Sequence, residues 1–286
     1  MEDVKVSYLA KDEIACPVCA TTFRREELLS GGGRLIAGSM THELHRLYEP
    51  SVKYGDVYPL VYQSTVCPEC WYASMEKDFS TIPRSVCEQV SQDRQKRKDE
   101  ISLIFPDIDF TKNRNLFTGA ASQYLTLVCY DYFNHNATPA IKQGMSSLRA
   151  AWLFDELNSK HPAENYDQLA LWFRKKAYFF YTEALHREQK GLESLGEAKN
   201  LGPDTDKNFG YEGVLYLSAY LSFKYGPTEN ANYRVEYLES SKRVIAKMVG
   251  GGKSSKAKPG PLIEYARTIY AEIKKELNST DLPEDE

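Results

Sequence analysis

The chain has 286 residues, of which 42% are hydrophobic and 12% aromatic, so it can bury a core and is not disordered throughout. Its formal net charge of −4 gives no overall attraction to nucleic acid or to an anionic membrane. No run of about 18 uninterrupted apolar residues is present, and the first five residues lack the basic and apolar regions of a signal peptide. These features predict a soluble, cytoplasmic protein.

Residues 1–82 are predicted to form a small α+β module of short elements. The expected order is a polar lead-in (1–15), a strand end with a helical turn (21–29), a glycine break (31–33), a short helix ended by Pro50 (40–48) and an alternating strand (57–66).

From residue 113 the spacing of apolar residues becomes helical. The polar residues 83–112 are predicted to be a charged connector, either a solvated helix or a linker, and residues 281–286 an acidic tail. Between them, residues 113–280 are expected to form a helical domain with a flexible loop at Gly250–Lys258. Its six predicted helices cover 117–132, 141–157, 169–190, 214–225, 233–248 and 261–277.

Two short sequences in the first module repeat the pattern Cys-Pro-x-Cys. The two-residue spacer lets both thiolates of one turn reach the same metal ion, and two such turns supply the four soft ligands of a tetrahedral zinc site. The 47 residues between the pairs exceed the usual zinc-ribbon spacing, so they must fold as an insert that brings the turns together. We predict a structural Zn²⁺ held by Cys16, Cys19, Cys67 and Cys70.

Other uses of these cysteines are less consistent with the sequence. A thioredoxin-like redox disulfide is disfavoured because the pairs occur twice and no βαβ pattern surrounds them. A catalytic zinc is disfavoured because four protein thiolates leave no open position for water or substrate. Of the two remaining cysteines, Cys129 lies on an apolar helix and is predicted to be a buried small hydrophobe, whereas Cys87 lies in a charged stretch.

The sequence Thr41-His42-Glu43-Leu44-His45 is one residue shorter than the His-Glu-x-x-His helix of metalloproteases. Histidines three positions apart can still face one ion on a helix, but no third ligand is evident. We expect this pair to be exposed polar surface.

A sequence motif for catalysis is not evident, since neither a Gly-rich phosphate loop nor a Gly-x-Ser-x-Gly elbow is present. Nucleic-acid binding remains an alternative, but the first 80 residues hold eight basic against twelve acidic residues, and a zinc tetrathiolate adds about two further negative charges. A metal-dependent enzyme is the weaker alternative.

Several blocks of the sequence together carry a family resemblance: Cys16–Cys19 with Phe23, Arg46–Tyr48, Pro59–Tyr62, Val66–Ala73 with Phe79, Ala121–Cys129, Arg149–Leu153 and Gly260–Glu276. These blocks resemble a bacterial family catalogued as domain of unknown function 2225. The resemblance implies a bacterial origin, a metal site at the four paired cysteines and tetratricopeptide-like helices after the cysteine module, but it implies no reaction. The family tends to place glycine after each cysteine pair, where this chain has Ala20 and Trp71.

The predicted fold is therefore mainly α, with a small zinc-ribbon-like α+β module followed by a tetratricopeptide-like repeat domain; an irregular helical bundle is the alternative. Stacked helix pairs form a concave surface, and the many tyrosines, with Trp152 and Trp172, could line it for a peptide. A place in the core is the other interpretation of both tryptophans. We expect a non-enzymatic zinc-binding scaffold or adaptor with a protein partner.

Overall fold

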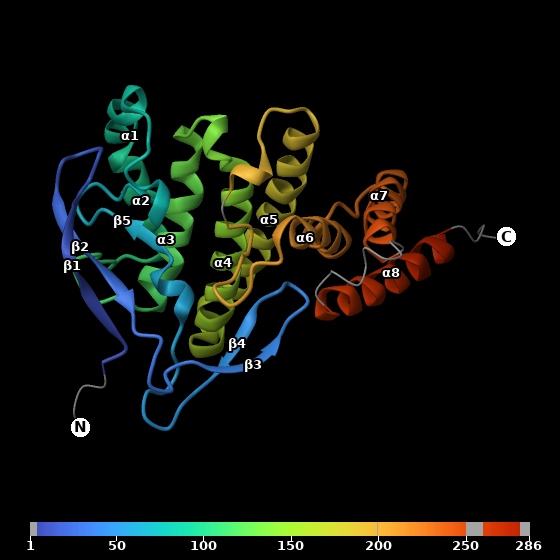
Figure 1. Ribbon diagram of the computed structural model, residues 1–286, viewed down its shortest axis with the longest axis horizontal. Coiled ribbons are helices and arrows are strands. Elements are labelled where there is room, and N and C mark those ends of the chain that lie inside the picture. The colour runs from blue at the N-terminus through green and yellow to red at the C-terminus, as the bar shows by residue number, and fades with distance from the viewer. Residues whose placement is uncertain (1–4, 199, 250–259, 281–286) are drawn as a thin grey trace.

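The computed structural model describes residues 5–198, 200–249 and 260–280 (Figure 1). Within these ranges eight α-helices accompany three two-stranded antiparallel sheets, which confirms a mainly α fold with a small α+β part at the N-terminus. The predicted loop Gly250–Lys258 and the acidic tail lie outside the described residues. The α-helices are α1 (Cys87–Gln92), α2 (Arg94–Ile104), α3 (Leu116–Cys129), α4 (Pro139–Lys160), α5 (Tyr166–Gln189), α6 (Gly210–Tyr225), α7 (Ala231–Val249) and α8 (Gly260–Thr280).

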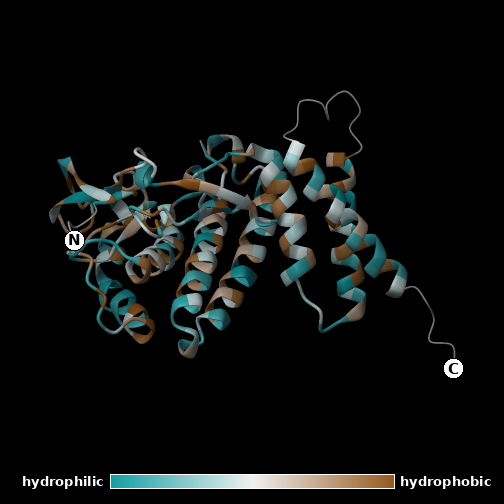
Figure 2. Cartoon of the chain, turned by 90° about the horizontal axis from the view of Figure 1, so that it is seen from below, coloured by the Kyte–Doolittle hydropathy of each residue, from teal (hydrophilic) through white to brown (hydrophobic). Residues whose placement is uncertain are grey.

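Helices α3 to α8 form a row in which each helix packs chiefly against its neighbours in sequence (Figure 1). Proline, which is preorganised for a first helical turn, stands at the start of α4 and at the second residue of α8. Most helices carry both apolar and polar bands, as amphipathic helices with one buried face do (Figure 2). None of the helices in the described ranges has the length and apolar character that a membrane span requires.

The N-terminal third differs from its predicted elements. The expected lead-in at 1–15 contains strand β1 (Ser7–Ala15), which pairs along the whole of β2 (Thr22–Leu28), so the helical turn predicted within 21–29 is wrong. The strand predicted over 57–66 is instead a 3₁₀ helix, Pro59–Tyr62, followed by only three residues of β5 (Ser64–Val66), which pairs with β6 (Ala73–Met75).

The helix predicted over residues 40–48 is also wrong. Strands β3 (Ile36–Met40) and β4 (Arg46–Glu49) pair here, and residues 41–45, the hairpin loop, join them. The loop is held by the helices: the Glu43 carboxylate accepts a hydrogen bond from Trp152 Nε1 on α4 at 2.6 Å and pairs with Arg174 on α5 at 2.7 Å. It also accepts one from the Tyr225 hydroxyl at the end of α6 at 2.8 Å. These long-range contacts outweigh the local helical pattern.

The polar stretch predicted as a connector forms α1 and α2 and is not simply solvated. It buries Val90 and Ile101, and also the guanidinium-bearing Arg97. One hydrophobic cluster joins α3–α8 to N-terminal residues such as Val61 and Trp71, and a second surrounds the paired cysteines.

Gly119 in α3 marks a close contact between the N-terminal part and the helices. A Cβ atom at this residue would lie 2.7 Å from Cγ2 and 3.1 Å from Cα of Val61. Helix propensity favours alanine by about 1 kcal/mol, but overpacking costs about 1–3 kcal/mol. We expect Gly119→Ala to lower the free energy of unfolding, measured with urea. The control is Gly260→Ala, where the Cβ meets open space. A more stable Gly119→Ala variant would contradict the contact.

Candidate metal centre

The first cysteine pair lies in the turn between β1 and β2. The Ala20 amide donates to the Cys16 carbonyl at 2.9 Å, and the Cys16 amide donates to the Thr21 carbonyl at 2.9 Å. These bonds fold the backbone tightly around the two sulfur atoms, so that the thiols of Cys16 and Cys19 lie on the same side of the turn.

The second pair lies in the turn between β5 and β6 and repeats the same backbone pattern. The Trp71 amide donates to the Cys67 carbonyl at 3.0 Å, and the Cys67 amide donates to the Tyr72 carbonyl at 2.9 Å. Two equivalent knuckles, 47 residues apart in sequence, therefore face one another.

The residue after each pair has a left-handed backbone, with φ of 60° at Ala20 and 56° at Trp71. A non-glycine residue is strained there by about 1–2 kcal/mol. We expect Ala20→Gly to raise the free energy of unfolding by about 0.5–1 kcal/mol, because the relief of strain exceeds the extra entropy of glycine. Thermal unfolding of the metal-loaded protein measures it.

Trp71→Gly is the contrasting variant for this prediction. Its ring packs on Phe110 at 5.3 Å between centroids, and Lys98 Nζ lies 5.3 Å from the Trp71 ring. We expect the loss of this buried ring to lower the free energy of unfolding by more than the relief of backbone strain raises it. If Ala20→Gly also destabilised the protein, the turn would not store strain at this position.

All four sulfur atoms lie within 4.8 Å of one another. Across the two knuckles, Cys16 Sγ is 3.6 Å from Cys70 Sγ, and Cys19 Sγ is 3.5 Å from Cys67 Sγ. Zinc bonded to four thiolates at about 2.3 Å would separate neighbouring sulfurs by roughly 3.8 Å. The cluster is thus compatible with a tetrahedral metal site.

Three of the four thiols change one another's pKa. Hydrogen bonds from Cys16 and Cys70 lower the pKa of Cys67, whereas the bond to Cys67 and burial raise the pKa of Cys16. Hydrogen bonding within the cluster, together with burial, likewise raises the pKa of Cys70. Cys16 and Cys70 therefore favour the thiol form, and a bound divalent cation would favour their thiolates.

Arg97 on α2 provides an independent test of whether a metal fits. Its side chain is buried, with 3% of the residue exposed, and Nη2 donates to the Cys70 carbonyl at 3.0 Å. Within the described ranges its Nε and Nη1 atoms have no hydrogen-bond partner, and no carboxylate forms an ion pair with it. A buried cation is costly unless opposite charge lies nearby. A zinc tetrathiolate carries about two negative charges, so it would add such charge next to the Cys70 carbonyl that Arg97 contacts.

The two lone cysteines lie outside the quartet. Cys129 is fully buried, as predicted; its Sγ accepts a hydrogen bond from the Ala73 amide at 3.5 Å, and burial raises the pKa of its thiol to about 11. Cys87 is half-buried and donates to the Pro83 carbonyl at 3.6 Å.

His42 and His45 do not join the metal centre. Among the described residues, the cysteine quartet is the one group of three or more metal-type side chains that converges, and it contains no histidine. His45 stacks on Trp152 at 4.2 Å, and its Nδ1 lies 2.5 Å from Asp204 Oδ2; His42 packs on Tyr265 at 4.6 Å. The expectation of exposed polar surface is therefore wrong.

Asp204 is a residue that the sequence did not single out. Burial alone would raise its pKa, but the hydrogen bonds from His45 and from the Arg46 and Thr205 amides lower it overall. Neither Asp204 nor Arg97 carries a local motif, so only the packed chain identifies them.

Comparisons with known proteins find a family and a relative that match nearly the whole chain. A family model described as an uncharacterized protein conserved in bacteria, DUF2225, matches residues 9–273. A protein of Borreliella burgdorferi, described as an uncharacterized protein, is 38% identical over 276 residues, which cover 96% of this chain and 99% of that protein. No solved structure was found to match. The match spans both cysteine knuckles and the helices up to most of α8, so the chain belongs to the DUF2225 family of bacterial proteins.

Proposed function

We propose that the protein is a non-enzymatic, zinc-binding scaffold that docks an acidic protein partner on the outer face of α5. The observation that supports this is a row of large apolar side chains left exposed on that helix. Leu171 is 41% exposed, Trp172 46% and Phe179 57%. At 100° per residue the three side chains fall on one face of α5, spread over about two turns.

The charge beside this apolar row indicates the partner's chemistry. Lys175 is exposed between the three apolar residues, and Lys176 Nζ lies 4.2 Å from the centre of the Trp172 ring. Aromatic anchors flanked by cations suit a partner segment that carries apolar and acidic side chains.

The predicted peptide-binding surface that would include Trp152 is a weaker candidate. Trp152 is buried, and the hairpin loop of the same chain already bonds to it through Glu43. Any peptide at that position would have to displace an intramolecular segment. The outer face of α5 carries no such occupant among the described residues.

In this proposal zinc has a structural role at Cys16, Cys19, Cys67 and Cys70. Four thiolates complete a tetrahedral shell, so the ion would join the β1–β2 and β5–β6 turns and leave no position for a substrate. Zinc identity is tested by metal analysis of purified protein together with displacement by Co²⁺, whose tetrathiolate absorption differs from that of other ligand sets.

The docking surface is tested by placing a photo-crosslinking amino acid at Lys175 in the native bacterium. We expect one discrete partner that is not captured from a crosslinker at Leu103, which is 87% exposed on α2. Trp172→Ala/Phe179→Ala should abolish capture without changing the circular dichroism, since exposed substitutions rarely affect stability by more than about 0.5 kcal/mol. Salt should weaken capture of an acidic partner. Equal capture from both positions, or capture that survives the double substitution, would contradict the surface.

The alternatives predict different results. A nucleic-acid-binding protein would give a saturable shift with RNA or DNA that weakens steeply with salt and does not depend on Trp172. A metal-dependent enzyme would need an open coordination position, which a cobalt spectrum showing an exchangeable fourth ligand would reveal.

A further inference from the structure

A cavity of about 440 Å³ lies where the end of α2, the start of α3 and the turn between α4 and α5 meet. This volume falls in the range of pockets that hold small molecules. The cavity is separate from the cysteine quartet, since none of the four cysteines lines it. The exposed apolar side chains on α5, Leu171, Trp172 and Phe179, do not line it either.

The floor of the cavity is aromatic and is fixed by the core. Phe105 and Tyr166 are buried, with ring centroids 6.0 Å apart, and Phe117 contacts Phe105 edge-on at 5.7 Å. Phe105 is in turn stacked on the buried Phe154 at 5.9 Å. Because these rings are held from behind, the floor does not have to form when a ligand arrives.

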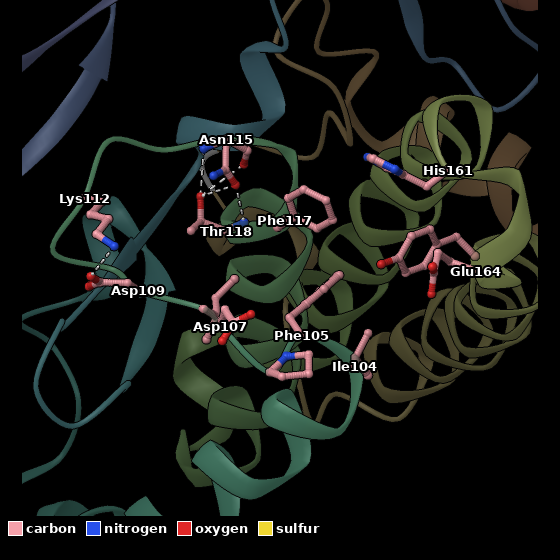
Figure 3. A pocket seen from close by; sticks show the side chains of 13 residues that line it. Ile104, Phe105, Asp107, Asp109, Lys112, Asn115, Phe117, Thr118, His161 and Glu164 are labelled. Carbon is pink, nitrogen blue, oxygen red and sulfur yellow. Dashed lines mark hydrogen bonds and ion pairs between the residues drawn. The ribbon is translucent and has the colours of Figure 1, made fainter.

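Some of the polar groups at the opening are already satisfied by one another. Asn115 and Thr118 form the capping box that begins α3, and Lys112 pairs with Asp109 at 3.5 Å (Figure 3). These four side chains therefore have little capacity left for a ligand.

Three polar side chains at the opening are unpaired. Asp107, His161 and Glu164 form no side-chain hydrogen bond or ion pair with another described residue. Asp107 lies on one side of the opening and Glu164 with His161 on the other, with Phe105 and Phe117 between them (Figure 3). The uncompensated charge around the aromatic floor is thus negative.

We propose that this cavity binds a small organic cation with an aromatic body. The ring would lie on Phe105 and Phe117, and the ammonium group would pair with the carboxylate on one side of the opening, Asp107 or Glu164. Aromatic faces attract cations and aromatic edges, so both parts of such a ligand meet complementary surface. An anion of the same shape would be repelled by the two carboxylates.

Three probes of nearly equal shape separate charge from size: tryptamine, the neutral tryptophol and the anionic indole-3-acetate. Binding to the full-length, metal-loaded protein is followed by the methyl resonances of Ile104 and Ile108, which both line the cavity. We expect tryptamine to bind most tightly and indole-3-acetate most weakly. Each exposed carboxylate should contribute a factor of about two to five in affinity.

Substitution of the acids provides the decisive comparison. Asp107→Asn/Glu164→Gln should make tryptamine and tryptophol bind equally, while Glu236→Gln/Glu264→Gln, which removes the same charge from exposed positions on α7 and α8, should leave the order unchanged. Both acids at the opening are exposed, so the fold should survive, and circular dichroism checks this. The proposal is overturned if no probe shifts the two methyl groups, if indole-3-acetate binds as tightly as tryptamine, or if the order survives the Asp107/Glu164 substitution.

Discussion

Glu43→Ala is expected to lower the free energy of unfolding by about 3–5 kcal/mol. The substitution leaves the largely buried guanidinium of Arg174 without its 2.7 Å partner in the hairpin loop. It also removes the acceptor for the buried Trp152 indole and for the half-buried Tyr225 hydroxyl. Urea denaturation followed by circular dichroism measures the loss.

Asp155→Ala is the matched control, because Asp155 pairs with the same Arg174 but is exposed. Its removal should cost less than about 1 kcal/mol. Glu43→Gln keeps the shape and one of the two acceptor oxygens while removing the charge, so it should fall between the two. If Glu43→Ala cost no more than Asp155→Ala, the hairpin loop would not be a significant support of the helices.

Cys67→Ser is expected to abolish stoichiometric metal binding and to destabilise the two knuckles, while most of the helical signal persists. Metal binding in such sites also contributes to the free energy of folding, because the ion would join the two knuckles directly. Cys67 is fully buried and its sulfur lies 3.5 Å from Cys19, so serine cannot replace it without loss. Metal analysis and thiol titration measure the loss of metal. Faster cleavage within residues 5–82 in limited proteolysis measures the destabilisation of the knuckles.

Cys87→Ser is the control for the metal centre, since Cys87 is a half-buried cysteine outside the quartet. It should retain full metal content. Wild-type protein with less than about half an equivalent of metal, and with all four thiols freely titratable, would contradict the site itself. Retention of metal by Cys67→Ser would show that this thiol is not needed.

The helices could be predicted because their signals are local. Six predicted segments correspond to α3–α8, and proline marks the starts of α4 and α8. Whether these helices form regular tetratricopeptide-like repeats, and whether the domain boundaries at 82 and 112 are correct, stays a prediction.

The N-terminal third could not be predicted in the same way, because distant residues decide its structure. The His-Glu-Leu-His sequence favours a helix locally, yet the hairpin loop forms because Arg174 and Trp152 bind Glu43 more than 100 positions later. The residues of β1 are mostly polar, so the sequence predicted an irregular lead-in here. They form a strand because they pair with β2.

For the metal centre, the Cys-Pro-x-Cys spacing alone predicted that the four cysteines act together, and the structure places their sulfur atoms together. The backbone strain at Ala20 and Trp71 could be anticipated from the family resemblance, which implies glycine at these two positions. The burial of Arg97 could not be predicted from the sequence, because this residue lies within a run of polar residues that are all expected to be solvated.

The β3–β4 hairpin also imposes an order on folding during synthesis. The Tyr265 hydroxyl on α8 donates a hydrogen bond to the Met40 carbonyl at the end of β3 at 2.7 Å, across a separation of 225 residues. At a translation rate of about 5–20 residues per second, Met40 is made roughly 10–45 s before that partner exists. Throughout this interval the nascent hairpin has no complete binding site, so its final docking must follow the emergence of the last helix.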